Sequence, residues 1–152
     1  MTSLRPLVAL AVAAAIPAIA VAQGSAPEPS SMKTFFPAIA RGDFDRAAAM
    51  IEGDVQVLST EVRTVAATSL SPAQFFERVR NCYLRAFYAK DGEPNSTIAS
   101  WMCPLKPSKA NPNRSRVILV KVAFEGDHVR LSDYFQRDST RPAPPPNLRP
   151  AD

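Results

Sequence analysis

The sequence has few of the residues that most often build catalytic and metal centres. Its 152 residues include one histidine, His128, and two cysteines, Cys82 and Cys103. A closed zinc site needs four ligands, and two sulfurs with one distant histidine are too few. His128 falls beside a turn, where solvent is expected, which argues against a histidine-based dehydratase and against Ser-His or Cys-His nucleophiles. We therefore expect no metal and no cofactor.

Concentrated charge and long apolar runs are also scarce. The 18 Lys and Arg residues outnumber the 14 Asp and Glu residues, but they are scattered and form no basic stripe interleaved with aromatic residues. We therefore expect no nucleic-acid partner. A glycine-rich phosphate loop is also absent from the sequence. The longest apolar run, residues 7–21, is too short and too rich in alanine for a membrane span.

That apolar run has the layout of an export signal. Residues 1–22 combine Arg5 in a short leading segment, the apolar run, and Ala20-Val21-Ala22 just before Gln23. We predict cleavage after Ala22, a periplasmic or secreted mature protein, and no membrane attachment after cleavage. An uncleaved N-terminal anchor is the alternative. Residues 23–31, rich in proline and serine, are predicted to form a disordered spacer.

The clearest structural pattern spans residues 116–136. Two alternating, β-branched runs flank Gly126-Asp127, a pair typical of a two-residue hairpin turn. One face is then apolar except for a single carboxylate, and the other face is mixed, as expected of a wetter or subunit-facing surface. The predicted pairs on the apolar face are Phe124 with Val129, Val122 with Leu131, Val120 with Asp133, and Ile118 with Phe135.

The carboxylate of Asp133 is the most interesting polar group in this pattern. Enclosed by apolar side chains, it would have its pKa raised by desolvation and could act as a general acid or base. Tyr83 or Tyr134 could then be its hydroxyl partner. The alternative, which we favour, is that the strand twists or bulges near Ser132 and leaves Asp133 at the rim or paired with an arginine.

The two cysteines are predicted to form a disulfide. Residues 82–88 and 97–103 alternate and are separated by a polar loop, as in a hairpin. Directly opposed residues have Cα separations of roughly 4.5–5.5 Å, which suits a disulfide, and export favours one. Two separately buried thiols are the alternative. The predicted pairs are Cys82 with Cys103, Leu84 with Trp101, Ala86 with Ala99, and Tyr88 with Thr97.

Two short helices are expected at the start of the folded region. Residues 32–41 and 43–51 carry apolar stripes at helical spacing, and Gly42 lies between them, where a helix end favours a left-handed residue. Residues 55–67 then alternate in the manner of one or two short strands. Their expected inward positions are Val55, Val57, Val62 and Val65.

A third helix is predicted to begin after Ser71. Ser71 and Gln74 form a capping-box pair, and Pro72 suits the first helical position. The end of this helix is ambiguous, because helical spacing persists almost to Ala89. The strand-like alternation after residue 82 and the opposed cysteines favour a break near Asn81.

The end of the sequence is rich in proline. Five prolines lie between Arg141 and Asp152, which predicts an extended tail that packs little. We therefore assign residues 32–137 to a single α+β domain and residues 138–152 to a disordered tail.

The predicted order is helix, helix, short strands, helix and four antiparallel strands. Ten residues of this pattern match a known family: Ala40, Gly42, Asp43, Ala47, Asp54, Val55, Phe124, Glu125, Gly126 and Val129. Over residues 32–136 the chain resembles the nuclear transport factor 2-like superfamily, in its SnoaL-like and ketosteroid-isomerase-like branches. The resemblance implies three N-terminal helices packed on a curved, mainly antiparallel sheet, a cone-shaped pocket between them, and a homodimer formed through the outer sheet face.

The resemblance does not select an activity, because similar folds serve isomerases, cyclases, dehydratases and transport adaptors. We interpret the chain as a binding or accessory module without catalysis, with a small apolar ligand as partner. Trp101, Phe87 and Phe124 are the candidate ligand contacts, although core packing is the favoured role for each ring. The alternative is a cofactor-free isomerase or lyase using Asp133 with a pocket tyrosine, a use that the ketosteroid-isomerase resemblance implies.

Overall fold

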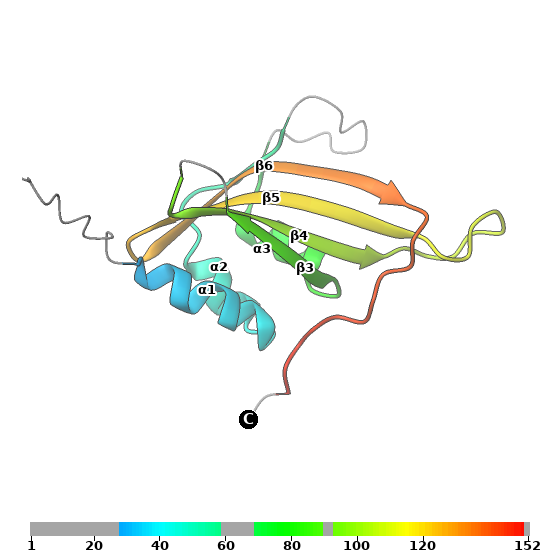
Figure 1. Ribbon diagram of the computed structural model, residues 1–152, viewed down its shortest axis with the longest axis horizontal. Helices are drawn as coiled ribbons and strands as arrows, with labels where there is room; N and C mark the ends of the chain where they lie inside the picture. Colours follow the sequence, from blue (N-terminus) through cyan, green and yellow to red (C-terminus); the bar gives the residue numbers. More distant parts are fainter. Residues whose placement is uncertain (1–27, 59–68, 90–92, 151–152) are drawn as a thin grey trace, which may run out of the picture.

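The computed structural model describes residues 28–58, 69–89 and 93–150, with the side chains of residues 86–89 left out. Three helices lie on one face of a curved antiparallel sheet (Figure 1), so the predicted α+β class is confirmed. The sheet has the order β3-β4-β5-β6, and β1 and β2 form a separate short pair. The elements are α1 (Ser30–Ala40), α2 (Phe44–Ala49), β1 (Val55–Gln56), β2 (Ser69–Leu70), α3 (Pro72–Val79), β3 (Tyr83–Ala89), β4 (Ser96–Pro104), β5 (Ser115–Glu125) and β6 (His128–Ser139).

The first two helices are separated at the predicted glycine. Gly42 has a φ of +78°, a value that favours glycine, and its N–H donates to the Ile39 carbonyl at 2.9 Å. Asp43 then caps α2 by accepting a hydrogen bond from the Arg46 N–H at 3.3 Å. Helix α1 begins beside the hairpin turn, where the Ser31 N–H donates to the Gly126 carbonyl at 3.1 Å.

Helix α3 begins with the predicted capping box. The Gln74 N–H donates to Ser71 Oγ at 3.2 Å, and the Ser71 N–H donates to Gln74 Oε1 at 2.9 Å. The helix ends at Val79 and β3 starts at Tyr83, so the expected break near Asn81 is correct. The apolar side of α3 is buried against the sheet.

The register of the β5–β6 hairpin is predicted correctly from the turn to Ser132 and wrongly beyond it. Val122 pairs with Leu131 and Lys121 pairs with Ser132, but the pairing then shifts, and Asp133 and Tyr134 both lie across from Val120. Asp133 has a φ of +54°, a strained value for a residue with a side chain. The extra residue moves every later side chain of β6 to the other face. Past the shift, Leu119 pairs with Phe135 and Ile118 pairs with Gln136.

The β3–β4 hairpin contains a similar shift. Leu84 pairs with Trp101 as predicted, but the register changes between Leu84 and Ala86. The two predicted pairs beyond this shift are therefore wrong, because the prediction assumes a symmetric hairpin without an extra residue. Ala86 pairs with Ser100 in place of Ala99, and Tyr88 pairs with Ile98 in place of Thr97.

Cys82 and Cys103 form a disulfide, with their Cα atoms 4.2 Å apart. The bond joins the start of β3 to the end of β4, as the opposed-cysteine pattern predicts. On the chain-entropy estimate, closing a loop of this length stabilises the fold by about 3 kcal/mol. The disulfide thus fixes the end of α3 and the start of β3 against the rest of the sheet.

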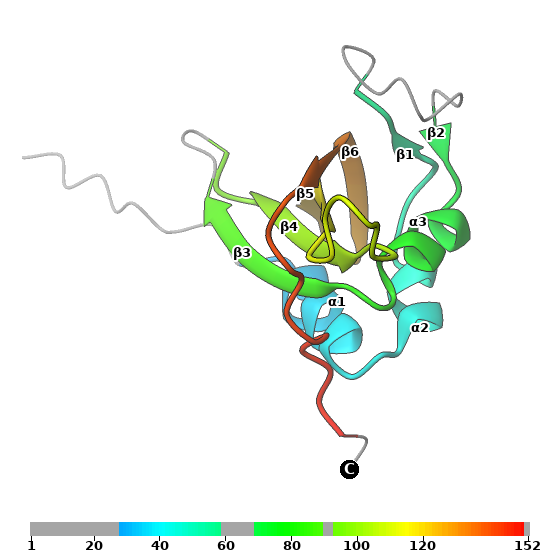
Figure 2. The same ribbon diagram turned by 90° about the vertical axis from the view of Figure 1, so that its right-hand side faces the viewer.

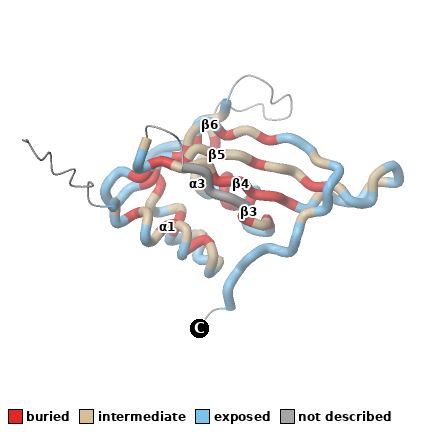
Figure 3. Tube along the Cα trace, viewed as in Figure 1, coloured by how far each residue is buried: buried red, intermediate tan, exposed pale blue. Residues whose placement is uncertain are grey.

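The core lies between the helices and the inner face of the sheet (Figure 3). From Val117 to Glu125, residues of β5 alternate between buried inner positions and more exposed outer positions. Val55 is fully buried, and Val57 forms a bridge to Tyr134. The predicted inward positions Val62 and Val65 lie outside the described residues. Among the described residues, no helix combines the length and apolar content that crossing a membrane requires.

The proline-rich tail contacts the domain at both ends of its described part. Ser115 Oγ donates to the Arg141 carbonyl at 2.6 Å, near the end of β6. Further on, the Asn147 side chain hydrogen-bonds to Leu84, and the Arg149 N–H donates to the Ala40 carbonyl at 2.6 Å. The tail therefore runs from β6 across β3 to the end of α1 (Figure 2).

Candidate functional site

The space between helices and sheet is occupied by aromatic rings. Trp101 is 1 % exposed and stacks edge-on with Phe75, their ring centres 5.4 Å apart. Phe75 also meets Tyr134 edge-on at 6.4 Å, and Phe35 meets Phe124 at 6.4 Å. Edge-to-face pairs at these distances are favourable. Trp101 and Phe124 are therefore core residues, and the candidate Phe87 has a side chain outside the described part of the chain.

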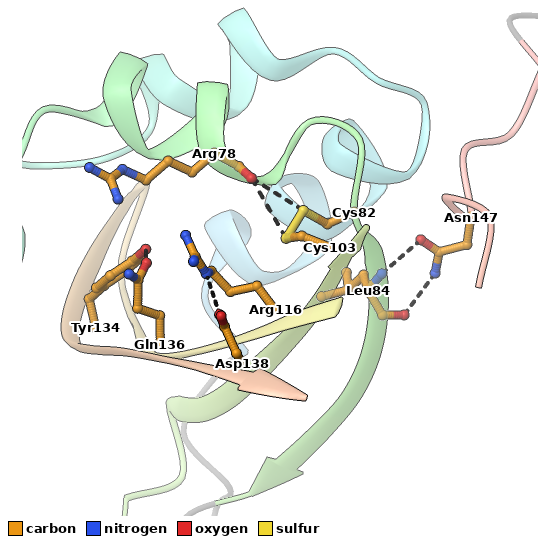
Figure 4. The surroundings of a disulfide bond; sticks show 9 residues. All are labelled: Arg78, Cys82, Leu84, Cys103, Arg116, Tyr134, Gln136, Asp138 and Asn147. Atoms are coloured by element: carbon orange, nitrogen blue, oxygen red, sulfur yellow. Dashed lines mark hydrogen bonds and ion pairs between the residues drawn. A yellow bond between two sulfur atoms is a disulfide. The ribbon is translucent and has the colours of Figure 1, made fainter. Parts of the chain in front are cut away.

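A polar cluster closes one end of this interior (Figure 4). The buried Tyr134 hydroxyl donates to Gln136 Oε1 at 2.7 Å and is also hydrogen-bonded by Arg78 of α3. Burial raises the pKa of Tyr134 above its ordinary value of 10.0, and the nearby charges of Arg78 and Arg116 oppose that rise only in part. The tyrosine is thus a neutral hydrogen-bonding group at neutral pH. Sequence reasoning missed this cluster because it depends on the register shift in β6.

Arg116 continues the cluster towards the surface. Its Nε lies 3.0 Å from Asp138 Oδ1, and Arg114 Nη2 lies 3.0 Å from Asp138 Oδ2. The hydrogen bond from Arg116 is the main reason that the pKa of Asp138 is lowered from its ordinary value. These side chains are partly exposed, so the ion pairs fix geometry more than they stabilise the fold.

The disulfide lies beside this cluster. The Arg78 carbonyl oxygen is 3.2 Å from Cys82 Sγ and 3.6 Å from Cys103 Sγ (Figure 4). A disulfide sulfur carries no proton, so these are close contacts and not hydrogen bonds. They place the C-terminal end of α3 directly over the bridge.

Asp133 lies on the outer face of the sheet, and the prediction that it points into the apolar interior is wrong. It is exposed, whereas its neighbour Tyr134 is fully buried, because the extra residue in β6 turns the two side chains to different environments. The favoured alternative, a bulge near Ser132, is the observed one. Asp133 borders a shallow groove of about 250 Å³ that is otherwise lined by Leu58, Ile98, Leu119, Val120, Lys121 and Phe135.

The remaining candidates are dispersed. Tyr83 is half-buried at the start of β3, and His128 is exposed beside the hairpin turn. The structure therefore does not bring Asp133 together with either tyrosine in a pocket. Within the described ranges, no group of three or more His, Cys, Asp or Glu residues is close enough to hold a metal ion.

A larger cleft lies where the tail meets α1 and β3. Its volume is about 500 Å³, within the range of small-molecule sites. We call it the tail cleft. Its walls are mainly apolar, and two arginines are among the residues that line it. It is lined by Phe36, Pro37, Ala40 and Arg41 of α1, Leu84 of β3, and Asn147, Arg149 and Pro150 of the tail.

Sequence reasoning missed the tail cleft because a segment with five prolines was expected to pack little. The only local signal is Asn147-Leu148, which interrupts the run of prolines with one polar and one apolar side chain. Nothing in its spacing indicates that it contacts residues more than 60 positions earlier.

Comparison with known proteins gives one distant structural likeness. No protein-family model matches the chain, and no curated protein matches it. Among solved structures, a chain described as a "putative polyketide cyclase" from Acidithiobacillus ferrooxidans is similar, with 13 % sequence identity and a TM-score of 0.39. The match covers 71 % of this chain and 84 % of that one. It indicates a distant fold relationship only.

Proposed function

We propose that the mature chain is an exported binding module without catalysis, and that it takes a small apolar ligand in the tail cleft. The observation that supports this most is the position of open space. The interior between helices and sheet is filled by rings, whereas the tail cleft is open to solvent and mainly apolar. Ligand sites are typically concave, apolar and marked by a few polar groups.

The polar border of the cleft indicates the ligand class. Arg41 and Arg149 both line it, and among the described residues neither forms an ion pair with a carboxylate. Asn147 adds an amide, although this amide is already hydrogen-bonded to Leu84. A ligand with an apolar body and one negative group would satisfy the arginines while burying its apolar part.

A fluorescent apolar anion, 1-anilinonaphthalene-8-sulfonate, tests this proposal. We expect one saturable site per folded chain. Ala40→Trp places a ring in the cleft and should abolish binding, whereas Ala49→Trp, at an exposed position of α2, should leave it unchanged. Removing one charge, by Arg41→Gln or Arg149→Gln, should weaken binding by about two- to fivefold. Equal binding by the Ala40→Trp and Ala49→Trp variants would overturn the proposal.

The isomerase or lyase alternative lacks a supporting geometry. Such an enzyme would need Asp133 beside a tyrosine hydroxyl inside a pocket that excludes water. Asp133 is exposed on the outer face, and the Tyr134 hydroxyl is already bonded to Gln136 and Arg78. We therefore retain the binding function.

We further propose that the protein acts in an oxidising compartment after removal of residues 1–22. The disulfide supports this, because such bonds persist mainly in exported proteins. N-terminal sequencing of the native protein should begin at Gln23, and its thiols should resist alkylation without a reductant. A native protein that retains Met1 or two free thiols would contradict the proposal.

A homodimer through the outer sheet face is the remaining proposal. The support is the shallow apolar groove at Ile98, Leu119 and Phe135. We expect native mass spectrometry to give twice the chain mass, and Phe135→Lys to give a folded monomer. A single-chain mass for the unsubstituted protein would rule the dimer out.

A further inference from the structure

The two edges of the main sheet are covered differently. Strand β6 is met by the segment after β1, where the Leu58 N–H donates to the Tyr134 carbonyl at 3.0 Å and Val57 bridges Tyr134. Strand β3 is the opposite edge. An edge strand presents backbone N–H and C=O groups that another extended chain can pair with.

Asn147 occupies one position on the β3 edge. Its Nδ2 donates to the Leu84 carbonyl at 2.9 Å, and the Leu84 N–H donates to its Oδ1 at 3.1 Å (Figure 4). A primary carboxamide offers an N–H donor and a C=O acceptor in one plane, as a peptide group does, and has one further N–H. The side chain therefore takes the place of one residue of an added strand.

The tail cannot extend this pairing in the manner of a strand. Pro142, Pro144, Pro145 and Pro146 have no N–H to donate, and they hold the segment extended. In the part of the chain that the structure describes, Asn147 is the only group that hydrogen-bonds to the outer edge of β3. Within these described ranges, the outer edge of β3 is thus held by a single two-bond contact.

We propose that the outer edge of β3 at Leu84 is a docking site for an extended segment of a partner protein, and that the tail is its tethered competitor. The partner segment pairs as an added strand through ordinary peptide groups, so it needs non-proline residues opposite Leu84. One of its apolar side chains enters the tail cleft beside Phe36 and Ala40. This docking does not depend on the small-ligand proposal, since the edge accepts a strand whether or not the cleft binds an organic anion.

The tether determines how strongly the tail competes. A segment tethered by a short linker that spans the distance to its site acts at an effective concentration on the order of millimolar. A free peptide at micromolar concentration therefore loses to the intact tail. It gains access when the tail contact is removed.

The test uses the full chain with Asn147→Ala, the unsubstituted full chain, and Leu148→Ala as a matched tail control. The probe is a fluorescent peptide with the sequence of residues 141–150 in which Pro144, Pro145 and Pro146 are replaced by threonine, which restores three N–H groups. Fluorescence anisotropy should show binding to the Asn147→Ala chain at least tenfold tighter than to either other chain. Hydrogen exchange at Leu84 should be slow in the unsubstituted chain, fast in Asn147→Ala, and slow again with the peptide.

Three results would overturn the proposal. One is no binding to Asn147→Ala, and another is equal binding to Asn147→Ala and Leu148→Ala. The third is a native mass for Asn147→Ala twice that of the unsubstituted chain, since the edge would then pair with its own copy. Loss of 1-anilinonaphthalene-8-sulfonate binding by Ala40→Trp is a separate readout, so the two proposals can fail independently.

Discussion

The interior between the helices and the sheet and the tail cleft both use side chains of α1. They differ in which other residues enclose them. The interior is sealed by rings from helices and strands and by the disulfide at one end. The tail cleft is open to solvent, and one of its walls is a segment without helix or strand that hydrogen-bonds at Leu84 and Ala40. In this small domain, large rings are needed for stability, and open space is left to the periphery.

The comparison also separates two ways of using a polar group. The Tyr134 hydroxyl is fully buried and is satisfied by Gln136 and Arg78, so it fixes the packing of β6 against α3. The Asn147 amide is partly exposed and joins the tail to the edge of β3 at Leu84. The first is expected to affect folding, and the second is expected to affect access.

The largest effect should come from opening the interior. Trp101→Ala removes a fully buried ring and should lower the free energy of unfolding by about 3–5 kcal/mol. Leu148→Ala, at a tail side chain that is 44 % exposed, should change it by less than about 0.5 kcal/mol. Urea unfolding of both variants measures the difference. Equal losses would show that the tail is as much a part of the core as Trp101.

The disulfide should come next. Replacing both Cys82 and Cys103 with alanine should lower the free energy of unfolding by about 3 kcal/mol, because the unfolded chain regains the freedom of the closed loop. Thermal unfolding of the unsubstituted chain with and without a reductant measures the same contribution of the disulfide to stability. An unchanged melting temperature on full reduction would contradict this contribution.

The buried hydroxyl should have a smaller effect that depends on pH. Tyr134→Phe removes the buried hydrogen bond from the Tyr134 hydroxyl to Gln136 Oε1 and should cost about 0.5–1.5 kcal/mol at neutral pH. Because burial raises the pKa of Tyr134, the folded state holds this proton more tightly than the unfolded chain does. The contribution of the protonated Tyr134 hydroxyl to stability is present below a pH of about 10. It is lost as the pH rises through the pKa that Tyr134 has in the folded state.

Urea unfolding between pH 8 and 11 checks this sign. The unsubstituted chain should lose stability more steeply in alkali than Tyr134→Phe. Parallel curves for the two proteins would mean that the hydroxyl is not protected by burial.

The smallest effect is expected at Asp138. Its pKa is lowered, chiefly by the hydrogen bond from Arg116, so its stabilising contribution is present above the ordinary carboxyl value and is lost as the pH falls through the folded-state value. The side chain is 45 % exposed, so solvent screening limits the loss in Asp138→Asn to less than about 1 kcal/mol. The free energy of unfolding of the unsubstituted chain and of Asp138→Asn should be measured between pH 2 and 7. The two values should differ near pH 7 and converge near pH 2. A larger gap at pH 2 than at pH 7 would reverse the assignment.

Much of the architecture follows from local sequence patterns. The Gly126-Asp127 turn fixes the register as far as Ser132, the Ser71 cap fixes the start of α3, and the opposed cysteines indicate that α3 ends before Cys82. Each of these depends on residues near one another in sequence or on a simple alternation.

The candidate site could not be obtained in the same way. The bulge at Asp133 lets the Tyr134 ring reach Phe75 and its hydroxyl reach Arg78, and these contacts join elements far apart in sequence. The tail cleft depends on one amide, Asn147, meeting the backbone of Leu84. Alternation and helical spacing carry no information on either contact.

The most direct test of the closed interior and open cleft is a ¹⁵N NMR titration with 1-anilinonaphthalene-8-sulfonate. The chain has one tryptophan, so the indole N–H of Trp101 gives a single signal from the interior. We predict saturable shifts of the Ala40, Arg41 and Leu84 amides and an unmoved indole signal. A shift of the Trp101 indole with unmoved amides around the tail cleft would contradict the account.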